Sequence, residues 1–275
     1  MIASAEPPPA LLAATQRPEV GVIDALRNTV SASRLNLFLS CRLKFYFRYV
    51  LKLKKAKTAA LHVGGAVHSV LKAWNKARWK LAPLTLKQLH DAFAEAWADQ
   101  EAEPVAWDND EAEHKTVGWR LVETYIRESK IPPELRPDAV EVPVEADLHE
   151  HGLPTLIGVL DLVQAGVIID YKTSGQTPNP ERALHTNEVQ TSMYSVLYRE
   201  ATGKTEQGIE IHTLVKLKTP KLAVTASPPM SEQQETRLFR VIEAYMHGLD
   251  VGDFVPSPGL QCVSCEFFAE CRVWP

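Results

Sequence analysis

The sequence lacks several features that mark particular classes of protein. No stretch approaches the roughly 18 consecutive apolar residues of a membrane-spanning helix, and residues 1–20 carry no basic region ahead of an apolar run. There is no internal repeat, and cysteine occurs only four times in 275 residues. A chain of this length needs no disulfide staples to bury a core. These absences predict a cytoplasmic protein with no membrane partner.

The charge of the chain is unevenly distributed. The composition, 45% hydrophobic and 23% charged, is that of an ordinary globular protein, with a net charge of -4. Eight basic residues and no acid lie between Arg34 and Lys57, whereas nine acids and no Lys or Arg lie between Asp91 and Glu113. The basic segment is suited to a polyanion such as a nucleic acid, and the acidic segment repels one.

The first half of the chain has a helical pattern. Residues 1–30, rich in Ala and Pro, predict a flexible lead, and the apolar spacing predicts a helix over 31–47 with Ser31 or Ser33 as its cap. We expect Gly64 and Gly65 to interrupt the chain before a second helix over 66–81. An acidic helical insertion follows over 83–139, with Trp97, Trp107 and Trp119 as its apolar anchors.

The second half alternates strands and helices. Valines 140, 142 and 144 alternate with acids, and the further predicted elements are strands over 156–163, 167–171, 209–217 and 222–226 and helices over 187–200 and 231–248. Ser231 and Gln234 have the spacing of a capping box. The order of the elements predicts an α/β protein with a mixed central sheet flanked by helices.

Charged side chains interrupt two apolar strands at Asp161, Asp170 and Lys172. Charge inside a strand pair is costly unless it is paired or binds a cation. Side chains alternate along a strand, so Asp170 and Lys172 share one face. A four-residue hairpin loop over 163–166 would place Asp161 diagonally from Asp170 on that same face.

Two carboxylates beside a lysine suit hydrolysis of a phosphodiester. The carboxylates can hold Mg²⁺ or Mn²⁺, and the lysine can orient or activate the attacking water. The alternative is a structural ion pair between strands, which is the commoner origin of a single D-x-K tripeptide.

The four cysteines are Cys41 and, within the last fourteen residues, Cys262, Cys265 and Cys271. Two disulfides do not suit a reducing compartment. Four thiolates suit structural zinc, although one of them lies more than two hundred residues from the others, and they equally suit a [4Fe-4S] cluster. The spacing alone leaves these two readings open.

The sequence resembles the RecB-like branch of the PD-(D/E)xK nuclease superfamily, in particular the stand-alone RecB-like exonucleases found with CRISPR systems and in phages. Six segments carry the resemblance in the order of that family: SASRLNLFLSCRLKFYFRYV at 31–50, GGAVHSVL at 64–71, GVLDLV at 158–163, VIIDYKT at 167–173, QTSMY at 190–194 and CVSCEFFAEC at 262–271. The acidic insertion matches nothing in it. The resemblance implies a restriction-endonuclease-like core.

The resemblance also assigns roles to residues. It implies that His68, Asp161, Asp170 and the main-chain carbonyl of Tyr171 are metal ligands and that Lys172 is the catalytic lysine. Gln190 and Tyr194 match a motif whose side chains lie beside the active site and help to position DNA. A nitrogen ligand such as His68 makes Mn²⁺ a better candidate than an all-oxygen site would.

The cysteine pattern also matches the resemblance. Family members with one N-terminal cysteine and a C-terminal C-x2-C-x5-C carry a [4Fe-4S] cluster, and Cys41, Cys262, Cys265 and Cys271 complete this pattern. The cluster would join the first helix to the tail at 249–275 and contribute to folding.

The basic segment predicts how a nucleic acid is held. We expect Phe38 and Phe47 inside the protein, and Arg42, Lys44, Lys52 and Lys54 facing a single strand.

These features together predict a divalent-metal-dependent DNA exonuclease acting on single-stranded or unwound ends, as one domain over 31–275. The alternatives are a catalytically idle nucleic-acid-binding module and a structure-specific endonuclease. Tyr198 stands where a P-loop ending at Gly203, Lys204 and Thr205 would need glycine, so we expect no ATP motor. A helicase, integrase or recombination protein is therefore an expected partner, in repair, recombination or CRISPR adaptation.

Overall fold

The computed structural model describes residues 19–98 and 104–275, and their contacts divide the chain into two compact units. The first unit comprises residues 19–55, 147–157 and 236–275, and the second comprises 56–146 and 158–235. Each unit is assembled from segments far apart in the sequence. The predicted single domain over 31–275 remains a prediction.

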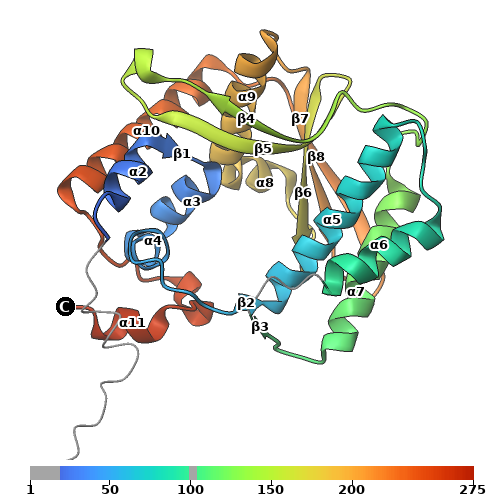
Figure 1. Ribbon diagram of the computed structural model, residues 1–275, viewed down its shortest axis with the longest axis horizontal. Coiled ribbons are helices and arrows are strands. Elements are labelled where there is room, and N and C mark those ends of the chain that lie inside the picture. Colours follow the sequence, from blue (N-terminus) through green and yellow to red (C-terminus); the bar gives the residue numbers. More distant parts are fainter. Residues whose placement is uncertain (1–18, 99–103) are drawn as a thin grey trace, which may run out of the picture. The chain divides into compact units, whose positions relative to one another are not determined.

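The second unit contains a mixed β-sheet (Figure 1). Its strands are β4 (Ala139–Ala146), β5 (Thr155–Gln164), β6 (Val167–Ser174), β7 (Gly208–Val215) and β8 (Lys221–Ser227), paired in that order. The first three residues of β5 belong to the first unit, where they pair with the short strand β1 (Thr29–Val30). β5 is antiparallel to β6, β6 is parallel to β7, and β7 is antiparallel to β8. The parallel pair is connected by two helices, α8 (Pro180–Thr186) and α9 (Glu188–Thr202). The predicted mixed sheet with helical flanks is confirmed.

Three helices lie on one side of this sheet, the first and third against the strands and the second mainly against the first, while α8 and α9 lie on the other side (Figure 1). The three helices are α5 (Ala59–Trp79), α6 (Leu86–Ala98) and α7 (Glu111–Glu128). Their buried side chains form one apolar cluster with Leu162, Ile169 and Leu214 of the strands. Trp97 is buried in this cluster and Trp107 and Trp119 pack against it, as expected for anchors. A short parallel pair, β2 (Lys57–Thr58) and β3 (Val105–Ala106), completes the unit.

The first unit is mainly helical. Its elements are α2 (Val22–Asn28), β1 (Thr29–Val30), α3 (Ala32–Ser40), α4 (Arg42–Phe45), a π-helical turn (Tyr46–Val50), two 3-10 turns (His149–His151 and Leu260–Ser264), the greater part of α10 (Glu232–Val251) and α11 (Phe268–Val273). Phe38, Phe45 and Tyr245 meet edge to face in its core. Phe38 and Phe47 are both buried, as predicted.

The hairpin between β5 and β6 differs from the predicted one. Gln164 pairs with Val167, so the loop has two residues, Ala165 and Gly166, both with positive φ (51° and 75°). Two-residue loops of this kind match the twist of the strands. The prediction of a loop over 163–166 was wrong by two residues in register. Because side chains alternate with a period of two, this error left Asp161 on its predicted face.

Three helix boundaries also differ from the predictions. The expected helix over 31–47 is divided at Cys41, whose extended backbone ends α3 and whose thiol accepts the N–H of Lys44 at the start of α4. Ser31 caps α3 as predicted. The predicted flexible lead over 1–30 is corrected for its last residues, which form α2 and β1, and residues 1–18 lie outside the described residues.

Gly64 and Gly65 do not interrupt the chain, because α5 begins at Ala59 and continues through both of them. Thr58 caps this helix by accepting the N–H of Leu61. Each interior glycine costs the helix about 0.5–1 kcal/mol relative to alanine, and burial of the apolar side of α5 offsets this cost.

The predicted capping box of α10 is confirmed, since Gln234 N–H donates to Ser231 and Gln234 accepts the Ser231 N–H. The helix does not stop at Gly248, however. A side chain there would collide with the ring of Phe38, so this glycine permits close packing and does not end the helix. No described helix is both long and apolar enough to cross a membrane.

Candidate active site

Asp161 and Asp170 lie on adjacent strands of the second unit. Continuing the register of Leu162 with Ile169 by one residue places Asp161 opposite Asp170. Asp170 is 2% exposed, and the Asp161 carboxylate accepts the N–H of Tyr171 at 3.1 Å. Burial raises the pKa of Asp161 to about 6, and the negative charge of Asp170 adds to this shift while His68 opposes it. Two buried carboxylates side by side form a site that favours a cation.

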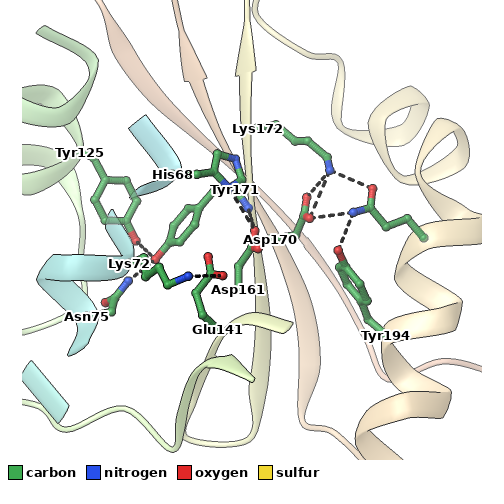
Figure 2. Close-up of polar contacts among 11 residues, drawn as sticks. His68, Lys72, Asn75, Tyr125, Glu141, Asp161, Asp170, Tyr171, Lys172 and Tyr194 are labelled. Atoms are coloured by element: carbon green, nitrogen blue, oxygen red, sulfur yellow. Dashed lines mark hydrogen bonds and ion pairs between the residues drawn. The ribbon is translucent and has the colours of Figure 1, made fainter. Parts of the chain in front are cut away.

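Lys172 lies beside Asp170 on the same face (Figure 2), and Gln190 forms hydrogen bonds with both. The Lys172 ammonium lies 2.9 Å from Asp170 Oδ2 and donates to Gln190 Oε1 at 2.8 Å. Gln190 Nε2 in turn donates to Asp170 Oδ1 at 3.0 Å and to the Tyr194 hydroxyl at 2.7 Å. Gln190 and Tyr194 are one turn apart on α9, so both face the sheet. The structure thus brings these four predicted residues together.

His68 approaches the carboxylates from α5. Its Nδ1 lies 3.7 Å from Asp161 Oδ2, and its ring meets the Tyr171 ring edge to face at 5.9 Å. The His68 side chain is 31% exposed. The prediction that His68 faces Asp161 agrees with this geometry, and its role as a metal ligand remains a prediction.

The side chain of Tyr171 points away from Asp170, into a buried polar chain (Figure 2). Asn75 donates to the Tyr171 hydroxyl at 2.9 Å and Tyr125 donates to it at 3.2 Å. The Tyr125 hydroxyl also lies 3.2 Å from His212 Nδ1. This chain of hydrogen bonds anchors Tyr171, which lies between Asp170 and Lys172 in the sequence. The sequence contained no spacing signal for it, because its members come from four separate elements.

Glu141 is a further charged neighbour that sequence reasoning missed. Its carboxylate pairs with Lys72 of α5 at 3.2 Å and raises the pKa of Asp161, after the larger effect of burial. Glu141 has a positive φ of 51°, which breaks the alternation of β4 and turns this acid inward while Val142 is 37% exposed. The even alternation predicted over 140–144 was therefore wrong, and it concealed Glu141.

The four basic residues predicted to contact DNA lie in the first unit, where three of them form ion pairs with acids. Arg42 pairs with Asp253, Lys44 pairs with Glu266 at 2.7 Å, and Lys52 pairs with Glu19 at 2.6 Å. Lys54 has no such ion pair among the described residues. A strand of nucleic acid would have to compete with these carboxylates, so the DNA-binding role of all four remains a prediction.

The four cysteines lie around one small apolar cavity of the first unit. Cys41, Cys262, Cys265 and Cys271 line it together with Phe47 and Phe267. Burial raises the pKa of the Cys271 thiol, and its proximity to the other three cysteines raises it further. The break of the helix at Cys41 is what turns this thiol toward the C-terminal tail.

The described part of the chain contains no ready-made site for a single metal ion. Across residues 19–98 and 104–275, no group of three or more His, Cys, Asp and Glu side chains is arranged so that it could hold a metal ion. At the carboxylate pair, the Asp170 carboxylate accepts hydrogen bonds from Lys172 and Gln190. The ligand sets predicted for a divalent metal and for a cluster therefore remain predictions.

Comparison with known proteins agrees with the fold. A crystal structure of a protein from Eubacterium rectale named "Putative exonuclease" is similar, with a TM-score of 0.59, 15% identity, and coverage of 91% of this chain and 89% of the other. At this identity the similarity shows the fold alone. No curated protein matches the sequence significantly.

A family model provides the stronger evidence. The model of the PD-(D/E)XK nuclease superfamily matches residues 29–272, which include both units and every residue of the candidate site. The central mixed sheet with flanking helices agrees with the restriction-endonuclease-like fold of that superfamily. The chain belongs to the PD-(D/E)XK nuclease superfamily.

Proposed function

We propose that the protein is a divalent-metal-dependent DNA exonuclease that hydrolyses phosphodiester bonds at single-stranded or unwound ends. The observation that carries this proposal is the grouping of Asp161, Asp170 and Lys172 on one face of the sheet with His68 beside them. A structural ion pair would need only one carboxylate for Lys172. The second, partly desolvated carboxylate at Asp161 is left without a basic partner closer than His68 at 3.7 Å.

The chemistry of these donors fits Mg²⁺ or Mn²⁺. Carboxylate and carbonyl oxygens are preferred by both ions, and an imidazole nitrogen is better tolerated by Mn²⁺. Asp161, Asp170, His68 and the carbonyl of Tyr171 would hold the ion. When bound, it would supply positive charge against the charge that develops on the phosphate during hydrolysis.

Lys172 is the residue placed to act on the attacking water. Asp170 and Gln190 hold its ammonium group, and one-third of its side chain is exposed to solvent. A held ammonium donates hydrogen bonds to a water or a phosphate oxygen without reorganising during the reaction. Gln190 fixes Lys172 and Asp170 relative to each other, and Tyr194 fixes Gln190.

A [4Fe-4S] cluster is the second part of the proposal. Such a cluster needs four thiolates, each on a different iron atom, so its cysteines surround a volume and do not converge on one point. Cys41, Cys262, Cys265 and Cys271 around one cavity support this arrangement. The cluster would fasten α4 to the C-terminal tail and add to the stability of the first unit.

Exonuclease activity is preferred over endonuclease activity because the structural neighbour carries an exonuclease name. The sequence has no ATP-binding loop, so unwound ends would come from a separate helicase or from recombination or integration machinery acting as a partner.

The test compares linear and circular single-stranded DNA of the same sequence, with Mg²⁺, Mn²⁺ or EDTA, using anaerobically purified protein. We expect degradation of the linear form only and none in EDTA. Degradation of the circular form would establish an endonuclease. Binding without cleavage of either form, in any metal, would establish an idle binding module.

A further inference from the structure

A large groove lies between α5 and α6 in the second unit, next to the candidate active site. Its volume is about 1080 Å³. Gly65 and Ser69 of α5 line it on one side, Ala92 and Ala96 of α6 line it on the other, and His68 and Lys172 are also among its lining residues. The groove is therefore continuous with the residues proposed to perform hydrolysis.

Gly65 is the position in this groove that the fold itself does not explain. It lies inside a 21-residue helix, where glycine is less favourable than alanine. A Cβ built on Gly65 meets no atom within 4 Å, and one built on the neighbouring Gly64 makes only an ordinary contact of 3.4 Å with Thr173. No packing among the described residues requires the missing side chain at Gly65. What the absence of a side chain provides is room for a molecule in the groove to approach the helix backbone.

The lining of the groove suits the backbone of a nucleic acid. Among the described residues that line the groove, Lys57 and Lys172 outnumber the one acid, Glu95, and Ser69 and Thr173 add hydroxyl donors. Small side chains on both walls leave width for sugars and phosphates. These groups recognise phosphate without reading bases, as expected for a nuclease of broad sequence range.

We propose that this groove seats the sugar-phosphate backbone of the DNA strand immediately next to the scissile phosphate, with Gly65 as the point of closest approach. The proposal rests on the proposed function and adds a path for the substrate. It also gives the acidic insertion over 83–139 a role, because α6 lies within it and forms one wall. The insertion would then be part of the substrate-binding surface, contrary to the expectation from its acidic residues that it repels nucleic acid.

The experiment uses two substitutions at Gly65 and one control in the full-length protein. Gly65→Leu fills the groove, Gly65→Ala adds only a methyl group, and Ala244→Leu adds bulk at an exposed position in the middle of α10, outside the groove. Binding of a short fluorescein-labelled single strand is measured by anisotropy in EDTA, so that no cleavage is required. Thermal unfolding and DNA cleavage are measured on the same preparations.

We expect Gly65→Leu to raise the Kd for the single strand at least about tenfold, whereas Ala244→Leu binds as the wild type does. Gly65→Ala should raise the unfolding midpoint by about 2 °C, since alanine favours the helix, and yet weaken binding. Loss of binding in a variant that folds more stably separates groove filling from damage to the fold.

Unchanged DNA binding in a folded Gly65→Leu protein would overturn the proposal, whatever its cleavage activity. The two claims fail separately. If the wild type binds DNA through the groove but cleaves none, the proposed function is wrong and the groove stands. If it cleaves DNA and Gly65→Leu binds and cleaves equally well, the proposed function stands and the groove is wrong.

Discussion

Replacing Gln190 by leucine should damage catalysis far more than the loss of one hydrogen bond would. The amide accepts from the Lys172 ammonium at 2.8 Å, donates to the Asp170 carboxylate at 3.0 Å and donates to Tyr194 at 2.7 Å. Leucine has a similar size and makes none of these bonds. Gln190→Leu therefore removes the amide that holds Lys172 and Asp170 in a fixed geometry, without opening a large cavity.

The magnitude follows from the type of bond. Hydrogen bonds to charged groups contribute about 1.5–3 kcal/mol each, and the partial exposure of Lys172 places its bond at the lower end. Because Asp170 and Lys172 still contact each other, we expect a loss of about 2–3 kcal/mol of transition-state stabilisation, which is roughly 30- to 150-fold in kcat/KM. Tyr194→Phe removes one neutral bond of about 1 kcal/mol and should cost about fivefold.

The assay is the initial rate of degradation of an end-labelled single strand in Mn²⁺, with thermal unfolding as the control for folding. Tyr194→Phe is the matched variant, because it lies in the same chain of hydrogen bonds but touches neither Lys172 nor Asp170. A Gln190→Leu enzyme within about threefold of the wild type, or one no worse than Tyr194→Phe, would refute the role given to Gln190.

Three further predictions concern stability and cofactor content. In cation-free protein, burial raises the pKa of Asp161 to about 6, so ionisation of this carboxyl opposes folding. The free energy of unfolding in urea should therefore fall as the pH rises from about 4 to 6, and Asp161→Asn should remove this fall. The same pH profile in Asp161→Asn and the wild type would contradict the prediction. Arg199→Ala leaves the buried Glu206 carboxylate without its paired cation and should lower the free energy of unfolding in urea by about 3 kcal/mol. A loss of less than about 1 kcal/mol would contradict this prediction. Cys271→Ser should abolish the visible absorption and lower the iron content of anaerobically purified protein, and a colourless, iron-free wild type would remove the cluster from the account.

Local chemistry made much of the fold predictable from the sequence. The capping box at Ser231, the cap at Ser31 or Ser33 and the largely apolar runs of β5 and β6 depend only on nearby residues, and the structure has the capping box, a cap at Ser31 and both strands. The hairpin register was not placed correctly, because the pattern of apolar residues is the same after a shift of two. Asp161 and Asp170 kept their common face for the same reason.

Boundaries set by tertiary contacts could not be predicted in this way. The sequence predicted breaks at Gly64, Gly65 and Gly248, but all three lie within helices. There the lack of a side chain affects how much room is left beside the helix. Glu141 was missed because a single positive φ reverses the faces of β4, and no sequence period records it. The ion pairs of Arg42 and Lys44 with distant acids were likewise invisible along the chain.

The most direct test of the account is metal-dependent degradation of end-labelled linear single-stranded DNA by the wild type, Lys172→Ala and Lys221→Ala, where Lys221 is an exposed strand lysine outside the site. The account predicts cleavage by the wild type and by Lys221→Ala in Mn²⁺ or Mg²⁺, with a loss of about 100-fold or more in Lys172→Ala while thermal stability is retained. Cleavage by Lys172→Ala at the wild-type rate would contradict the assignment of this site as the catalytic centre.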